Sequence, residues 1–213
     1  QPAALTTIII PDPAAVCAGI DLSLNGSPAG GTGTYTTHLW TGDTGPLSST
    51  AVVTPTFNSA STGTFNLTYS VTDDNACNAT DVIAVTVNIN PTASISPDPA
   101  NACDGINLSI DGSPSGGSGT YTTHLWSGAT GPLSSTTISN PLFNAGPGSY
   151  LLTYTVTDDN GCEGTDVITV TTDTNTTVAV AGPVQNLCNT SSSTLAANTP
   201  RISETGTWST VSG

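Results

Sequence analysis

The sequence predicts an all-β chain of tandem immunoglobulin-like β-sandwich domains arranged end to end. Residues 11–58 match residues 97–144 at 33 of 48 positions, an offset of 86 residues. A repeat of about this length is the size of one small sandwich domain and exceeds the 20 to 50 residues of a solenoid unit. Apolar residues alternate with polar ones, as in strands with one buried face, and no window shows a 3.6-residue stripe.

The alternation places the strands of each copy. Phe65, Leu67, Tyr69 and Val71 alternate with polar residues, and the second copy repeats this pattern from Tyr150. Turn-forming Gly, Pro, Asn and Asp residues separate such runs. In the first copy we expect strands at 4–10, 20–24, 35–40, 51–57, 65–72 and 82–87, the last two joined by a turn at 73–76 that matches 158–161.

Domain boundaries are expected near Asn90 and Asn175, where one strand runs almost directly into the next. This gives a first domain at 1–90, a second at 91–175 and the N-terminal part of a third, truncated domain at 176–213. The third segment carries Cys188 and Trp208 in the order of the front half of a sandwich. We therefore expect the chain to be a mature or internal piece of a longer polypeptide, with the partner of Cys188 beyond residue 213.

The charge balance narrows the classes of partner. Lysine is absent, Arg201 is the one strong cation, and the net charge is −14. Nucleic-acid binding depends on Lys and Arg that neutralise phosphates, so we expect no nucleic-acid partner. Anionic membrane surfaces are disfavoured for the same reason. No apolar run reaches the roughly 18 residues of a membrane span, so none is expected.

The repeat aligns four of the five cysteines. Cys17 matches Cys103, and Cys77 matches Cys162. The simplest expectation is one bridge within each domain, Cys17–Cys77 and Cys103–Cys162, each closing a loop worth on the order of 4 kcal/mol. Metal binding is the alternative, but no CxxC or HxxxH spacing is present. Disulfides imply an oxidising compartment outside the cytoplasm.

The repeated Trp and His residues are expected to be structural. Trp40 and Trp126 lie on a mid-domain strand, where an immunoglobulin-like sandwich places its core Trp, and Trp208 follows in the third segment. His38 and His124 each precede this Trp by two residues and share its strand face. We expect each His to be packed with one hydrogen bond, the alternatives being a ligand or metal site and catalysis.

Acidic residues around the repeated turn are the candidates for ion binding. Several carboxylates near one hairpin could supply the six to eight oxygens that Ca²⁺ prefers. The alternative is that Asp and Asn form turn hydrogen bonds, and no DxDxDG loop is present. No other cofactor or metal is expected. The calcium candidates are Asp73, Asp74, Asp81, Asp158, Asp159 and Asp166.

Three runs resemble a known family. GSYLLTYTVTDDNGCEGTDVITVT (148–171) and CDGINLSIDGSPSGGSGTYTTHLWSG (103–128) are similar to PKD-like and SprB-like immunoglobulin-fold repeats of giant surface proteins of Bacteroidetes-type bacteria. The segment 181–213 resembles another repeat of the same proteins. The resemblance implies a β-sandwich, export often by type IX secretion, and a part in adhesion, gliding motility or surface filaments. It brings no catalytic residues, and the WDFGDG-type motif of classical PKD domains is missing.

We therefore expect a non-enzymatic structural repeat region, a stalk or filament, of a long exported protein at the bacterial cell surface. Its expected partners are neighbouring domains of the same chain, with other copies in a filament and surface glycans or abiotic surfaces as further candidates. Two alternatives remain open. The domains are a ligand- or glycan-binding module, or they are the spacer of a secreted multidomain enzyme.

Overall fold

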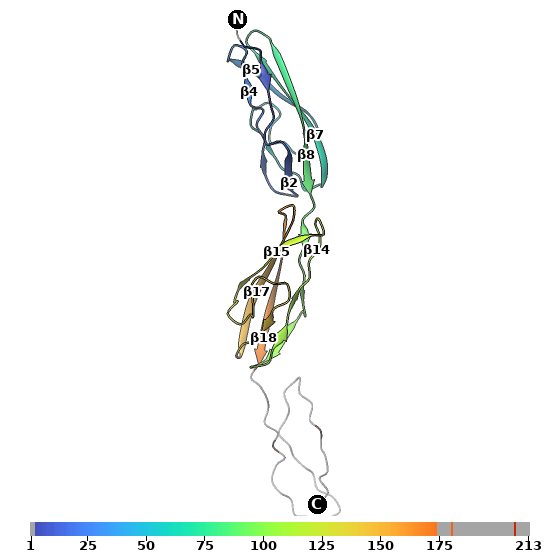
Figure 1. Ribbon diagram of the computed structural model, residues 1–213, viewed down its shortest axis with the longest axis vertical. Helices are drawn as coiled ribbons and strands as arrows, with labels where there is room; N and C mark the ends of the chain where they lie inside the picture. The colour runs from blue at the N-terminus through green and yellow to red at the C-terminus, as the bar shows by residue number, and fades with distance from the viewer. Residues whose placement is uncertain (1–2, 174–179, 181–206, 208–213) are drawn as a thin grey trace, which may run out of the picture.

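The computed structural model describes residues 3–173, Val180 and Thr207, and every regular element among them is a β-strand. The all-β class predicted from the sequence is thus confirmed. The strands form two similar sets that follow each other along the chain and lie end to end (Figure 1).

Each set is built on one four-stranded sheet in which the first strand is parallel to the last and the other pairs are antiparallel. The two longest strands of each sheet form a hairpin, because a short turn joins them directly. The first sheet has the order β2 (Ala14–Cys17), β8 (Asn78–Asn88), β7 (Gly63–Asp73), β5 (Tyr35–Gly42). The second has the order β11 (Ala100–Cys103), β18 (Glu163–Asp173), β17 (Gly148–Asp158), β15 (Tyr121–Gly128).

Short antiparallel pairs accompany each four-stranded sheet. In the first set these are β1 (Thr6–Thr7) with β4 (Pro28–Ala29), and β3 (Leu22–Ser23) with β6 (Thr56–Phe57). In the second they are β9 (Pro91–Thr92) with β14 (Ser115–Gly116), β10 (Ile95–Ser96) with β13 (Asp111–Gly112), and β12 (Leu108–Ser109) with β16 (Leu142–Phe143).

The alternating residues of β7 and β17 face the cores. Leu67, Tyr69 and Val71 are buried, and the intervening Thr68 and Ser70 are partly exposed. The Trp40 and Tyr69 rings pack 4.8 Å apart, and the second copy repeats the contact. Since strand side chains alternate between faces, the sequence pattern alone is enough to assign these residues to the core.

Gly26 is required where the chain passes the Tyr69 ring. A Cβ atom built on Gly26 would lie 2.2 Å from Tyr69 Cε1, and one built on Gly112 would lie 2.6 Å from the Tyr154 ring. No side chain can occupy that space without moving the tyrosine. These glycines therefore allow backbone to pack directly on the central aromatic residue of each core.

Several strand bounds in the first domain differ from the sequence-based expectation. The expected strands at 4–10, 20–24 and 51–57 shrink to the two-residue β1, β3 and β6. By contrast, no strand is predicted at β2, because prolines precede it and its sequence, Ala-Ala-Val-Cys, shows no alternation of apolar and polar residues. This omission matters, since β2 carries Cys17 to the end of the domain.

Candidate functional site

The junction between the two strand sets is the most distinctive site of the described chain. Cys17 is the last residue of β2, which pairs in parallel with β8 so that Cys17 lies beside Asn88 at the end of the first domain. Cys162 lies in the turn between β17 and β18, at the near end of the second domain. The two cysteines form a disulfide with a Cα–Cα distance of 5.5 Å across 145 residues of sequence.

The expected pairings Cys17–Cys77 and Cys103–Cys162 were therefore wrong. Cys77 immediately precedes Asn78, the first residue of β8, whereas Cys17 lies beside Asn88, the last. β8 has 11 residues, which at roughly 3.3 Å each places its two ends about 35 Å apart. A disulfide needs Cα atoms within about 7 Å. The same geometry separates Cys103 from Cys162 along β18, and Cys77 and Cys103 are exposed free thiols.

Two further links hold the junction. Only Ile89 and Asn90 lie between the end of β8 and the start of β9, so the connection is short. The Asn90 side-chain Nδ2 donates a hydrogen bond to the carbonyl of Ala18, 3.1 Å away. The chain and the disulfide thus connect the second domain to the first at neighbouring points, and the hydrogen bond fixes the linker to the first domain, an arrangement that restricts bending.

Buried aspartates hold the turns that present Cys77 and Cys162. Asp73 Oδ1 accepts hydrogen bonds from the backbone N–H groups of Asn75 and Cys77, and its Oδ2 accepts one from Thr32. Burial disfavours the carboxylate, but the backbone N–H groups of Cys77, Thr32 and Asn75 outweigh it and lower the pKa of Asp73. Asp158 accepts the equivalent bonds from Ser118, Asn160 and Cys162.

The calcium candidates do not form an ion site within the described residues. Asp81 and Asp166 accept hydrogen bonds from the backbone N–H groups of Ile9 and Ile95, respectively. Asp74 and Asp159 are exposed. In the described part of the chain, no group of three or more His, Cys, Asp or Glu side chains is placed to hold a metal ion. The carboxylates of Asp73, Asp81, Asp158 and Asp166 instead fix loops to the sheets.

The histidines lie against core tyrosines. His38 Nδ1 is 2.5 Å from the Tyr69 hydroxyl, and His124 Nδ1 is 2.5 Å from that of Tyr154. Burial, with a smaller contribution from Tyr35, raises the pKa of Tyr69 to about 12. Burial also raises the pKa of Tyr154 to about 12, with help from nearby Asp111 and Tyr121. Each tyrosine thus keeps its proton well above neutral pH and can donate it to the Nδ1 atom of its histidine.

The tryptophans lie in the cores. Trp40 and Trp126 are 1% and 2% exposed, and their Nε1 atoms donate to the carbonyls of Val52 and Ile138. They offer no exposed ring on which a sugar could stack. The positions of Cys188 and Trp208 lie outside the described residues.

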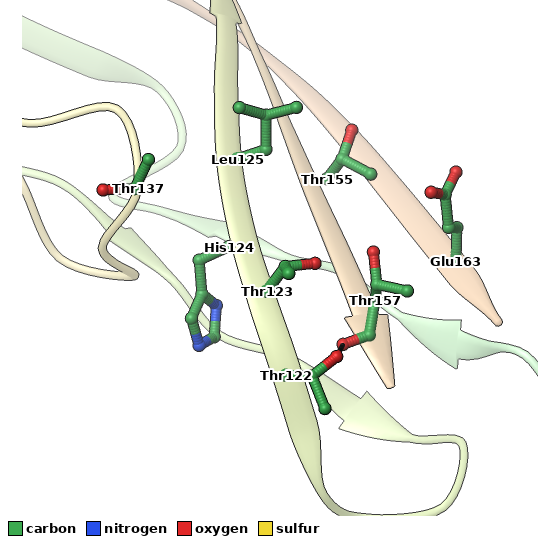
Figure 2. Close-up of a pocket in the computed structure, with 8 residues that line it drawn as sticks. All are labelled: Thr122, Thr123, His124, Leu125, Thr137, Thr155, Thr157 and Glu163. Carbon is green, nitrogen blue, oxygen red and sulfur yellow. Dashed lines mark hydrogen bonds between the residues drawn. The ribbon is translucent and has the colours of Figure 1, made fainter. Parts of the chain in front are cut away.

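A shallow hollow of about 450 Å³ lies on the outer face of the second sheet (Figure 2). Threonines of β15 and β17 line it together with His124, Leu125, Thr137 and Glu163. The Thr122 hydroxyl donates to the Thr157 carbonyl and so is engaged with the sheet itself. The hollow thus presents hydroxyl and methyl groups with one imidazole and one carboxylate, and Nδ1 of that imidazole is engaged with the Tyr154 hydroxyl.

No helix among the described residues has the length and apolar character needed to cross a membrane.

Among known proteins, the chain is similar in structure to fibronectin(III)-like and immunoglobulin domains. No family model matches the chain, and no curated protein matches it. The Clostridium thermocellum CbhA fibronectin(III)-like modules are 16% identical, with 79% of this chain and 94% of that chain covered and a TM-score of 0.40. The I67–I69 I-band fragment from titin is 13% identical over 81% and 66% of the two chains, TM-score 0.39. Immunoglobulin domains 1–4 of Sidekick-1 are 14% identical over 80% and 50%, TM-score 0.36.

Proposed function

We propose that this chain is the structural repeat region, a stalk or filament, of a long exported bacterial cell-surface protein. The observation that carries the proposal is the disulfide between Cys17 and Cys162, which joins one domain to the next. A bond inside a domain stabilises that domain, whereas a bond between domains fixes their relative position. Such a bond is most useful where a series of domains has to transmit force or hold a distance.

The geometry of the junction supports a mechanical role. A tandem of domains joined by flexible linkers bends freely, but here the two-residue connection and the Asn90–Ala18 hydrogen bond lie beside the disulfide. Two points of attachment at one interface resist both bending and twisting. The second domain is therefore expected to extend the axis of the first.

The disulfide also supports export. Disulfides persist in oxidising compartments such as the periplasm, the cell surface and the medium, and are rare in the cytoplasm. The resemblance of the repeats to PKD-like and SprB-like domains narrows the proposal to adhesion, gliding motility or surface-filament formation in a Bacteroidetes-type bacterium, with type IX secretion as the route. In this proposal the work of the domains is spacing and display.

The chemistry of the described side chains fits a non-enzymatic role. The two histidines are bonded to buried tyrosine hydroxyls, and the aspartates of the turns accept backbone N–H groups. Acid–base catalysis requires such groups to reach a substrate. Here they hold loops and cores instead.

Immunogold labelling of intact producing cells with an antibody to residues 97–173 tests the proposal. Gold strung along thin fibres that leave the cell is the expected result. Gold confined to the medium would overturn it and favour a spacer module of a secreted enzyme. A strain that lacks the gene is the control for antibody specificity.

A further inference from the structure

The two free cysteines of the described chain occupy the same places as the two bonded ones. Cys17 and Cys103 each end the strand that pairs in parallel with the last strand of their sheet, beside Asn88 and Asp173. The following backbone N–H, of Ala18 or Asp104, donates to that neighbour's carbonyl at 2.9 Å in both copies. The Cys103 thiol is therefore presented at the far end of the second domain as the Cys17 sulfur is at the end of the first.

The turn cysteines match in the same way. The N–H of Cys77 donates to Asp73 Oδ1 at 2.8 Å, and that of Cys162 donates to Asp158 Oδ1 at 2.9 Å. The carbonyl of each cysteine accepts the N–H of the same aspartate. Yet Cys162 is 1% exposed, whereas Cys77 is exposed. The two cysteines differ in exposure because Cys162 is bonded to Cys17 of the other domain, whereas no domain lies against Cys77 in the described chain.

The free thiols cannot pair with each other within one chain. Cys77 lies at the end of the first domain that faces away from the junction, and Cys103 lies at the end of the second that faces away from it, because each is a full long strand from the junction cysteine of its own domain. Two folded domains therefore separate them (Figure 1). A cysteine of another domain could therefore reach either exposed thiol by stacking on that end.

We propose that Cys103 and Cys77 each form a further interdomain disulfide with a cysteine of another domain. Cys103 would bond to the turn cysteine of a like domain stacked below it, and Cys77 to the strand-end cysteine of a like domain stacked above it. The bonds would form a series, one at every junction, with a spacing of one domain. This proposal deepens the proposed function, since a stalk linked in this way is covalently joined both along its backbone and across each interface.

The linker sequence agrees with a repeated junction. Asn90, which donates to Ala18, is matched 85 residues later by Asn175, and Asn88 is matched by Asp173. The Cys17–Cys162 bond is the independent observation that gives the two free cysteines their partner, because it joins their counterparts at the junction the structure contains.

The bond-forming step is an oxidation. The two thiols lose two protons and two electrons as one S–S bond forms. The electrons pass to an exchange partner of the disulfide class, either an oxidoreductase or a low-molecular-weight disulfide, whose own S–S bond is reduced to two thiols. The stacked domain could belong to the same polypeptide or to a second copy of the chain. The chemistry of the bond is the same in both cases.

Disulfide mapping of the native protein tests the proposal. The protein is isolated from producing cells with free thiols blocked at lysis, digested without reduction, and analysed by mass spectrometry. The expected result is a Cys103 peptide linked to the turn cysteine of another domain, and a Cys77 peptide linked to a strand-end cysteine. Blocked, unpaired Cys77 and Cys103, or bonds to cysteines at other positions, would overturn it while leaving the immunogold result unaffected.

A mixing experiment identifies the source of the partner domain. Chains of residues 1–213 carrying Cys77→Ser and Cys188→Ser are mixed with size-tagged chains carrying Cys103→Ser and Cys188→Ser, then oxidised with glutathione disulfide. Random pairing of the two variants would make half of all dimers mixed. If second copies stack, the mixed dimer makes up more than half. If the native bonds lie within one polypeptide, the mixed dimer stays at or below random, and the native protein keeps its mass on non-reducing gels.

Discussion

Cys17 and Cys162 lie in different domains, 145 residues apart in the sequence, and are bonded across the junction between them. The bond joins the end of a strand to a hairpin turn, two elements that are each fixed to their own sheet by backbone hydrogen bonds. It therefore constrains how one whole domain is oriented on the other.

Replacing Cys17 with Ser is expected to loosen the junction without unfolding either domain. Each core remains complete, because the bond contributes to the interface and not to the packing of Trp40 or Trp126. Small-angle X-ray scattering should show a broader distribution of interdomain distances, with an unchanged circular dichroism spectrum. Cys77→Ser is the control and should leave the distribution as it is. Equal distributions for Cys17→Ser and the wild type would contradict a bracing role.

Tyr154→Phe is expected to destabilise the second domain by about 1 kcal/mol, since a hydrogen bond contributes roughly this much. The change leaves the ring packing on Trp126 intact but removes the hydroxyl that pairs with His124. Chemical denaturation measures the difference. Tyr121→Phe removes a hydroxyl that bonds to Gly116 at an exposed site, so its effect should be smaller. An equal effect of both substitutions would argue against a special role for the His–Tyr pair.

Alkaline unfolding is expected between about pH 10 and 12. The pKa of both Tyr69 and Tyr154 is raised from 10.0 to about 12 in the folded chain. A group with a raised folded pKa contributes stability that is fully present below its unfolded pKa and is lost as the pH rises through the folded one. The part of the near-ultraviolet tyrosinate absorbance that Tyr69 and Tyr154 contribute should rise together with loss of the fold. Ionisation of all tyrosines near pH 10 in a folded chain would contradict this.

Asp73→Asn is expected to lower the melting temperature at neutral pH, and the difference should shrink in acid. The amide cannot accept from all three backbone N–H groups that the carboxylate binds. Because the folded pKa of Asp73 is lowered, its contribution is present above the ordinary value of 3.8 and is lost as the pH falls through the folded pKa. Calorimetry over this pH range measures it. Asp74→Asn, at an exposed neighbour, should change little.

Gly112→Ala is expected to cost about 1 to 3 kcal/mol, the usual range for overpacking a core. The new Cβ would lie 2.6 Å from the Tyr154 ring and push its hydroxyl away from His124. Gly131→Ala is the matched control, because nothing lies within 4 Å of the Cβ at that position. Thermal denaturation of both variants gives the comparison. A neutral Gly112→Ala would mean that the ring shifts freely.

The sequence predicts the local structure of this chain well. Alternation in Leu67, Tyr69 and Val71 identifies a strand and its buried face, because side chains of a strand alternate by geometry alone. The repeat indicates that the second copy forms the same strands and core as the first. The short strand at Ala14–Cys17 lacks a comparable pattern, since its four residues do not alternate between apolar and polar, and sequence reasoning misses it for that reason.

The sequence by itself determined the all-β class, the strands that form the cores and the equivalence of the cysteines in the two copies. Only the tertiary structure decided which cysteines meet. Aligning Cys17 with Cys103 shows that the two residues are equivalent. That equivalence is compatible with disulfides within each domain and equally with disulfides between domains. The choice depends on the parallel pairing of β2 with β8, which carries Cys17 to the end of the domain opposite Cys77. That pairing joins segments more than 60 residues apart, so no local pattern encodes it.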